Sequence, residues 1–124
     1  MTKLSGTLYI VSTPIGNLQD ITYRAVETLS AVSLIAAEDT RHSKKLLNHY
    51  GIKRPLISYY EHNRFTRIPQ ILTHLNDGKD VALISDAGTP GISDPAYKLT
   101  RAAITENITV ETIPGPSAVL AGLI

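Results

Sequence analysis

Residues 81–95, which read Val-Ala-Leu-Ile-Ser-Asp-Ala-Gly-Thr-Pro-Gly-Ile-Ser-Asp-Pro, decide the fold class of this chain. The apolar run 81–84 has the length of a buried strand, and the glycines and proline of 88–91 predict a loop directly after it. Asp94 and Pro95 then suit the N-cap and the first position of a helix. Open α/β sheets bind their ligands where a buried strand leads through such a loop into a helix.

The same order of signals occurs twice more in the chain. The apolar run 8–11 is followed by Ser-Thr-Pro-Ile-Gly-Asn at 12–17, and 110–113 is followed by Pro-Gly-Pro-Ser at 114–117. A single loop of this kind is a weak signal, because many turns between strands and helices contain glycine for local reasons. Three with the same polarity predict one shared site, since a parallel sheet brings its strand ends to one edge.

The rest of the chain alternates strand and helix patterns. Further strands are predicted at 33–37 and 56–60, and helices from about 20, before a C-cap at Gly51, across 68–75 and from 95 to about 107. Pro69 must lie in the first turn of its helix or kink it. Core-facing stripes are expected at Ile21, Ala25, Leu29 and Val32, at Leu46, Leu47 and Tyr50, and at Ile68, Ile71, Leu72 and Leu75. The pattern predicts an α/β fold, an open parallel five-stranded sheet with helices on both faces.

Composition limits the possible classes of protein. The chain has 124 residues, 43% of them hydrophobic and 19% charged, a net charge of +1 and no cysteine. These values exclude a disordered chain, a disulfide scaffold and a thiolate metal site, and they give no dominant field for nucleic acid or membrane. Without a signal peptide or a run of membrane-spanning length, a cytoplasmic protein is expected. The uncapped apolar stretch 117–124 leads us to expect that residues 1–124 are the N-terminal domain of a longer protein.

Several common site motifs are missing from the sequence. There is no Gly-x-x-x-x-Gly-Lys-Ser/Thr, no Gly-x-Gly-x-x-Gly after the first strand, no Gly-x-Ser-x-Gly and no His-Glu-x-x-His. A P-loop NTPase, a standard dinucleotide fold, an α/β-hydrolase and a metal site are therefore not expected. Loops that are rich in backbone groups and poor in cations favour a nucleoside-like cofactor held by backbone groups and an apolar wall.

Four segments together carry a family resemblance. Residues 12–18, 37–41, 85–95 and 114–118 resemble, in order and spacing, the rRNA-modifying branch of the tetrapyrrole methylase superfamily, and the similarity runs from about 8 to 124. The resemblance implies S-adenosyl-L-methionine bound between two domains, a homodimer, and 2′-O-methylation of a cytidine ribose in the decoding region of 16S rRNA, the RNA of the small ribosomal subunit. One departure is that the superfamily often has Gly-Gly-Asp-Pro where this chain has Ala-Gly-Thr-Pro at 87–90, so the usual acid is missing.

The resemblance also implies which residues contact the cofactor. Each implied contact has a plainer alternative, namely a tight turn or ordinary helix packing. The implied cofactor contacts are Pro14, Ile15, Gly88, Thr89, Ile92, Ser117 and Ala118.

Candidates for the chemical step come from two charged clusters. Glu38, Asp39 and Arg41 follow the second strand, and they either orient the target ribose or its phosphate, or form an N-cap at Asp39 or Thr40 beside a solvated arginine. Because a ribose hydroxyl is a poor nucleophile, a base is expected; Asp39 and Glu38 are the first choices. His62, between Glu61 and Asn63, is the second choice, with a solvated loop histidine as the alternative.

Six further cations have two possible roles. They could contact RNA phosphates or form a solvated face, and the net charge of +1 favours the second role. These residues are Lys44, Lys45, Lys53, Arg54, Arg64 and Arg67. Two other functions also remain open for the chain, a tetrapyrrole C-methyltransferase acting on a porphyrinoid and a non-enzymatic nucleotide-binding module.

Overall fold

The computed structural model describes residues 4–13, 21–84 and 94–113. Strands and helices alternate along the chain, as the sequence predicts. They are β1 (Thr7–Val11), α1 (Tyr23–Ala31), β2 (Leu34–Ala37), α2 (Thr40–His49), β3 (Leu56–Ser58), the 3-10 helix η2 (Glu61–Asn63), α3 (Arg64–Asn76), β4 (Val81–Ile84), α4 (Asp94–Thr105) and β5 (Thr109–Ile113).

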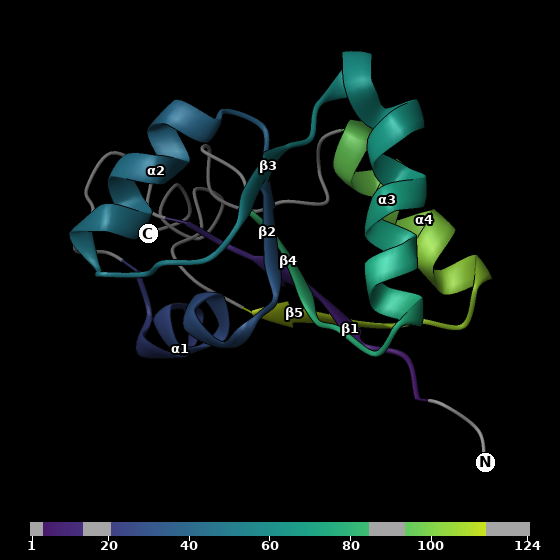
Figure 1. Cartoon of the computed structure of the whole chain (residues 1–124), viewed down its shortest axis with the longest axis horizontal. Coiled ribbons are helices and arrows are strands. Elements are labelled where there is room, and N and C mark those ends of the chain that lie inside the picture. Colours follow the sequence, from purple (N-terminus) through teal and green to yellow (C-terminus); the bar gives the residue numbers. More distant parts are fainter. Residues whose placement is uncertain (1–3, 14–20, 85–93, 114–124) are drawn as a thin grey trace, which may run out of the picture.

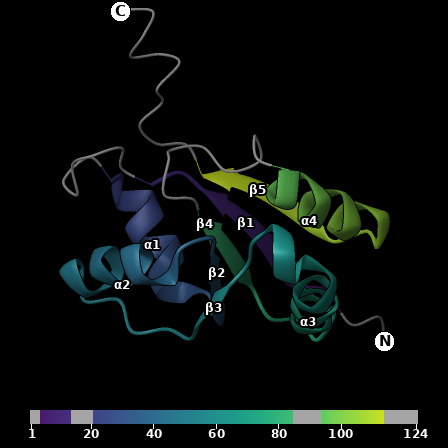
Figure 2. The same cartoon turned by 90° about the horizontal axis from the view of Figure 1, so that it is seen from above.

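The strands form one open sheet in the order β3-β2-β4-β1-β5, and every pair is parallel. Helices α1 and α2 cover one face of the sheet, and α3 and α4 cover the other (Figures 1 and 2). The chain therefore moves from β1 through β2 to the β3 edge, then reverses over the opposite face to β5. The predicted five-stranded parallel α/β fold is confirmed.

The core is divided by the sheet into two apolar clusters. Alternate residues of each central strand point to opposite faces, so Leu8 and Ile10 of β1 pack with α3 and α4, whereas Val11 packs with α1 and α2. Every residue of β2 and β4 is buried, which is expected for strands covered on both sides. Burial on both faces explains why the sequence is apolar at every position of 34–37 and 81–84.

Three helices end in the same cap. The second residue after each helix has positive φ, namely Gly51 at 67°, Gly78 at 85° and Asn107 at 61°. After α4, for example, Ile108 N donates to Ala103 O at 3.0 Å, which satisfies a carbonyl of the last turn. The predicted C-cap at Gly51 is confirmed.

Several element boundaries differ from the sequence prediction, and so does the place of one proline. Helix α1 begins at Tyr23 rather than near residue 20, because the Thr22 side chain accepts a hydrogen bond from Ala25 N at 3.1 Å and acts as N-cap. Helix α4 begins at Asp94 and ends at Thr105. Strand β3 ends at Ser58, before the tyrosines at 59 and 60. Pro69 lies in the second turn of α3 and not in the first, and the helix continues through it.

The start of β1 depends on close contact with the turn before β4. Gly6 N donates to Leu75 O at 2.7 Å, and Thr7 N donates to the Asp80 carboxylate at 2.8 Å. A Cβ atom on Gly6 would lie 1.9 Å from the backbone oxygen of Lys79, which cannot move without displacing the turn.

We expect Gly6→Ala to lower the free energy of unfolding by about 2 kcal/mol or more, because the added methyl group overlaps backbone atoms. Chemical denaturation measures the change, with the exposed neighbour Ser5→Ala as a control expected to stay within about 0.5 kcal/mol. Equal stabilities of the two variants would contradict the close approach.

Candidate functional site

The carboxyl ends of all five strands lie in register. Val11 is paired with Ile84 of β4 and Ile113 of β5, Ile84 with Ala37 of β2, and Ala37 with Ser58 of β3. Each segment that follows a strand therefore leaves from the same edge of the sheet. The prediction that three strands with Pro/Gly-rich continuations end together is confirmed.

Strands β1 and β4 form the topological switch point of the sheet. They are neighbours, yet the chain after β1 leads to α1 on one face, and the chain after β4 leads to α4 on the other (Figure 2). Such a divergence opens a crevice at the carboxyl ends of the strands, where α/β sheets bind ligands. The predicted cofactor contacts stay predictions, since they lie outside the described residues: Pro14, Ile15, Gly88, Thr89, Ile92, Ser117 and Ala118.

Two buried hydroxyl residues lie directly after β1 at this switch point. Ser12 and Thr13 are each only 3% exposed. Ser12 N donates to Ile113 O at 3.3 Å, which continues the pairing of β1 with β5 beyond the last strand residue. Both residues belong to the first of the three loop motifs, and the sequence pattern assigns them no role. The structure adds them as buried polar groups at the switch point.

The cluster after β2 is organised by Asp39. Its Oδ1 accepts hydrogen bonds from Arg41 N at 3.0 Å and His42 N at 3.4 Å, so Asp39, and not Thr40, is the N-cap of α2. Glu38, Asp39 and Arg41 are exposed. The capping role foreseen for Asp39 is therefore observed, and a chemical role for the three charged side chains stays a prediction.

The cluster after β3 is held by Asn63. Its Nδ2 donates to Ser58 O at 3.1 Å and to Ser58 Oγ at 3.0 Å, while its Oδ1 accepts from Tyr60 N at 2.8 Å. These bonds fix the tight turn that presents His62 to solvent. The His62 ring contacts the partly exposed Tyr60 ring edge to face, with centroids 5.9 Å apart. Asn63 therefore shapes the turn that carries His62.

Glu61 has a role that the sequence did not reveal. Its Oε1 pairs with Arg64 at the start of α3 and lies 3.5 Å from Lys98 Nζ on α4. Its Oε2 is buried without a hydrogen-bond partner. The Tyr59 hydroxyl, furthermore, donates to the carbonyl of Pro95 at the start of α4. The segment after β3 is thus attached to α4, the helix that follows β4. The residues that make these contacts are too far apart in the sequence for a local pattern to predict them.

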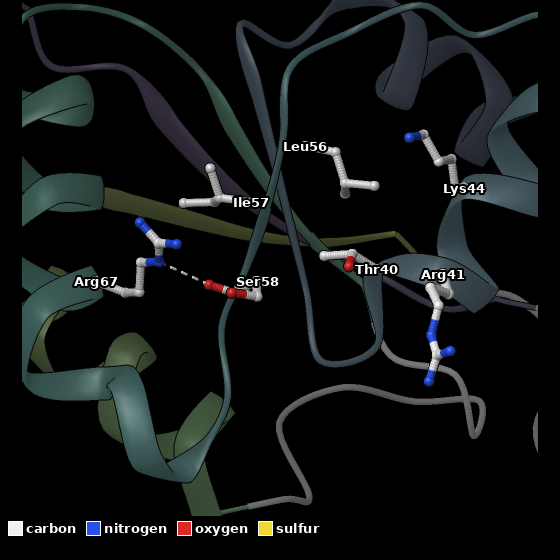
Figure 3. A pocket seen from close by; sticks show the side chains of 7 residues that line it. All are labelled: Thr40, Arg41, Lys44, Leu56, Ile57, Ser58 and Arg67. Atoms are coloured by element: carbon white, nitrogen blue, oxygen red, sulfur yellow. Dashed lines mark hydrogen bonds between the residues drawn. The ribbon is translucent and has the colours of Figure 1, made fainter.

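A groove follows the open edge of β3 between α2 and α3 (Figure 3). Its volume is about 460 Å³. Of the six cations considered in the sequence analysis, Lys44 and Arg67 line it together with Arg41. Arg54 instead donates to Ser30 O near the end of α1 at 2.8 Å. The lining residues are Thr40, Arg41, Lys44, Leu56, Ile57, Ser58 and Arg67.

Metal ligation has no support in the described part of the chain. Within it, no group of three or more His, Asp or Glu side chains is arranged to hold a metal ion.

Stability measurements can separate the contribution of the Asp39 cap from that of its charge. Asp39→Ala removes the cap and is expected to lower the free energy of unfolding by about 1 kcal/mol, whereas Asp39→Asn keeps a good capping side chain and should cost only a few tenths, about 0.3 kcal/mol. Denaturant titration of both variants measures the difference. A destabilisation by Asp39→Asn as large as that by Asp39→Ala would show that the charge, and not the cap, stabilises the helix.

Comparison with known proteins places this geometry in a family. The family model described as Tetrapyrrole (Corrin/Porphyrin) Methylases matches residues 7–123, which run from β1 to beyond β5. Among solved structures, uroporphyrin-III-C-methyltransferase from Thermus thermophilus superposes with a TM-score of 0.72 at 18% identity, covering 95% of this chain and 52% of that one. A conserved hypothetical protein from Aeropyrum pernix K1 superposes at 0.69 with 17% identity, covering 96% and 42%. At these identities the likeness concerns the fold alone.

Curated relatives are much closer in sequence. Three proteins named Ribosomal RNA small subunit methyltransferase I share 58% identity in Synechocystis sp., 54% in Halalkalibacterium halodurans and 54% in Haemophilus influenzae. The alignments cover 96%, 96% and 99% of this chain, but only 43%, 41% and 44% of the relatives. The chain thus spans about two-fifths of the length of the relatives it matches. With a family model matched along almost the whole chain, the chain belongs to the tetrapyrrole (corrin/porphyrin) methylases.

Proposed function

We propose that residues 1–124 form the N-terminal domain of a two-domain, S-adenosyl-L-methionine-dependent enzyme that methylates a cytidine ribose 2′-hydroxyl in the decoding region of 16S rRNA. The observation that carries the proposal is the 58% identity, over 96% of this chain, to a protein named Ribosomal RNA small subunit methyltransferase I. The working enzyme is proposed to be a cytoplasmic homodimer. In the described ranges, no helix has both the length and the apolar character needed to cross a membrane.

The chemistry of the switch point supports this cofactor. A nucleoside that carries a sulfonium needs backbone donors, small residues and an apolar wall more than it needs cations. Strands β1, β4 and β5 end here in Val11, Ile84 and Ile113, which are buried in the core beneath α1 and α2, and the buried Ser12 and Thr13 follow β1. The residues proposed to hold the cofactor are Pro14, Ile15, Gly88, Thr89, Ile92, Ser117 and Ala118. When bound, S-adenosyl-L-methionine supplies a methyl group that is already activated for transfer.

The protein must then orient the ribose, exclude water and accept a proton. A base near the 2′-hydroxyl raises its nucleophilicity as the O–H proton departs. Asp39 is the first choice, with Glu38, because the two backbone bonds to Oδ1 fix the carboxylate and leave its second oxygen for a proton. Arg41 is proposed to orient the ribose or its phosphate, and His62 is the second candidate base. Correct alignment is the main contribution asked of these residues.

A porphyrinoid substrate is the alternative within the family. The solved uroporphyrin-III-C-methyltransferase shares the fold at 18% identity, which does not carry substrate specificity. The sequence Ala-Gly-Thr-Pro at 87–90, in place of Gly-Gly-Asp-Pro, argues against it. A non-enzymatic nucleotide-binding module is the alternative outside enzymes.

The decisive experiment uses the full-length protein that contains this chain. It is incubated with S-adenosyl-L-methionine and assembled 30S subunits from a strain that lacks the enzyme, and the new 2′-O-methyl group is mapped. We expect one modified cytidine in the decoding region. Transfer to a porphyrinoid instead, or cofactor binding without transfer to either substrate, would establish one of the two alternatives.

The cofactor assignment predicts a local steric effect at Gly88. In the full-length enzyme, Gly88→Leu should abolish S-adenosyl-L-methionine binding, because a large side chain would occupy the space that the cofactor needs. The circular dichroism spectrum should change little. Isothermal titration measures the affinity, and an unchanged affinity would refute the placement of Gly88 at the cofactor.

The base assignment predicts a separation of turnover from binding. Asp39→Asn keeps the helix cap but lacks the proton-accepting carboxylate, so methyl transfer should fall by about 10²-fold or more. The affinity for S-adenosyl-L-methionine should stay within a few-fold. Single-turnover rates on 30S subunits test this, and a normal rate in the folded variant would leave Asp39 with its capping role alone.

A further inference from the structure

The groove along the open edge of β3 lies apart from the crevice proposed for the cofactor. Strand β3 is at the edge of the sheet, and β2 separates it from β4. Two strand spacings, about 10 Å, therefore lie between the groove and the nearer strand of the switch point. Arg41 lies in the first turn of α2, next to the edge where all five strands end. A chain molecule that enters the crevice could thus continue across this edge into the groove.

Charge is the second feature of the groove. Arg41 and Lys44 extend from one side of β3 and Arg67 from the other, and none of the described residues that line the groove is acidic (Figure 3). Some cations elsewhere are paired with an acid, since Arg24 pairs with Glu111 at 2.6 Å and Arg64 pairs with Glu61. Within the described ranges, no ion pair involves the three cations of the groove. The groove thus gathers three positive charges on a chain whose net charge is only +1, and this concentration of charge favours an anionic ligand.

Two hydrogen bonds fix the orientation of the Arg67 guanidinium in the groove. Its Nε donates to Ser58 O at 2.9 Å, and its Nη1 donates to Gln70 Oε1 at 2.9 Å. Both acceptors are uncharged, so neither of them offsets the positive charge of the guanidinium. The two bonds use two of its five N–H donors. A guanidinium whose orientation is already fixed loses less entropy when it binds the oxygens of a phosphate.

The surroundings favour a nucleic acid over a small free anion. Leu56 and Ile57 add apolar surface to the groove, which suits a sugar better than an isolated phosphate. Just beyond Ser58, the exposed His62 and the partly exposed Tyr60 offer aromatic rings on which bases can stack. Cations for phosphates beside rings for bases are the two elements of single-strand binding surfaces.

We propose that this groove, through Lys44 and Arg67 with Arg41 at its mouth, binds the phosphodiester backbone of the RNA substrate next to the nucleotide that is methylated. The inference rests on the proposed function for the identity of the RNA. Contacts to phosphate position a nucleic acid without reading its sequence. The groove therefore holds the strand in place, and it leaves the choice of nucleotide to the crevice.

The test measures how salt affects binding of the full-length protein to a short single-stranded oligoribonucleotide of mixed sequence. Each phosphate contact contributes about 0.7 to the slope of log affinity against log salt concentration. The double variant Lys44→Gln/Arg67→Gln should lower the slope by about 1.4 and weaken binding at low salt by about tenfold per contact. Lys45→Gln, on the same helix but outside the groove, makes the same charge change as Lys44→Gln and should leave the slope unaltered.

A charge-preserving variant guards against a folding artefact. Lys44→Arg/Arg67→Lys disturbs the same positions but keeps both charges, so it should retain the slope even if its thermal stability changes. Inorganic phosphate is titrated in parallel, since a groove that binds it as tightly as the oligonucleotide would be a small-anion site, and the RNA assignment would be overturned.

The remaining outcomes separate the two proposals. An unaltered slope in the double variant, or no RNA binding by the unmodified protein, overturns the groove assignment. If the double variant keeps the slope of the unmodified protein, and the unmodified protein methylates 30S subunits, the groove assignment is overturned and the proposed function stands. If the slope falls in the double variant but the unmodified protein methylates no RNA, the proposed function is refuted and the groove stands as an RNA-binding site.

Discussion

Parallel pairing brings the ends of all five strands into line at one edge of the sheet. Parallel pairing places Ser58, Ala37, Ile84, Val11 and Ile113 side by side, so every connection that follows a strand starts from one line. The alignment is stable because β2 and β4 are buried on both faces, and a shift of one residue would exchange the side chains that pack against α1 and α2 with those that pack against α3 and α4. Packing in the two cores thus sets the geometry of the sheet edge, where function is proposed.

Connections between distant segments then fix the periphery of this edge. The turn after β3 is closed by Asn63 and fastened to α4 through Tyr59 and Glu61. The exposed Tyr60 and His62 are therefore carried by a segment that is attached to both β3 and α4. Catalysis and substrate positioning both require such support for the side chains that perform them.

Much of the fold could be predicted from the sequence, for identifiable reasons. The runs 81–84 and 34–37 are apolar at every position, as double burial demands, and the glycine at 51 marks a cap that needs positive φ. Boundaries were less predictable, because they depend on a few hydrogen bonds. Thr22 starts α1 later than its apolar stripe suggests, and β3 stops where Asn63 and Arg67 take the Ser58 carbonyl. For the candidate site, the predicted cap at Asp39 is observed, whereas the predicted cofactor contacts lie outside the described residues.

Sequence patterns alone predict the class of fold, the polarity of the strand-loop-helix units and the charged clusters after the second and third strands. These features are local, since periodicity, caps and turn residues act over a few positions. Three relations become visible only in three dimensions: β1 and β4 are neighbours, Lys98 lies near Glu61, and Arg67 of α3 lines the same groove as Lys44 of α2. Strand order and cross-helix contacts arise from the way the two apolar layers pack onto the sheet, and packing joins residues whose separation along the chain leaves no periodic signal.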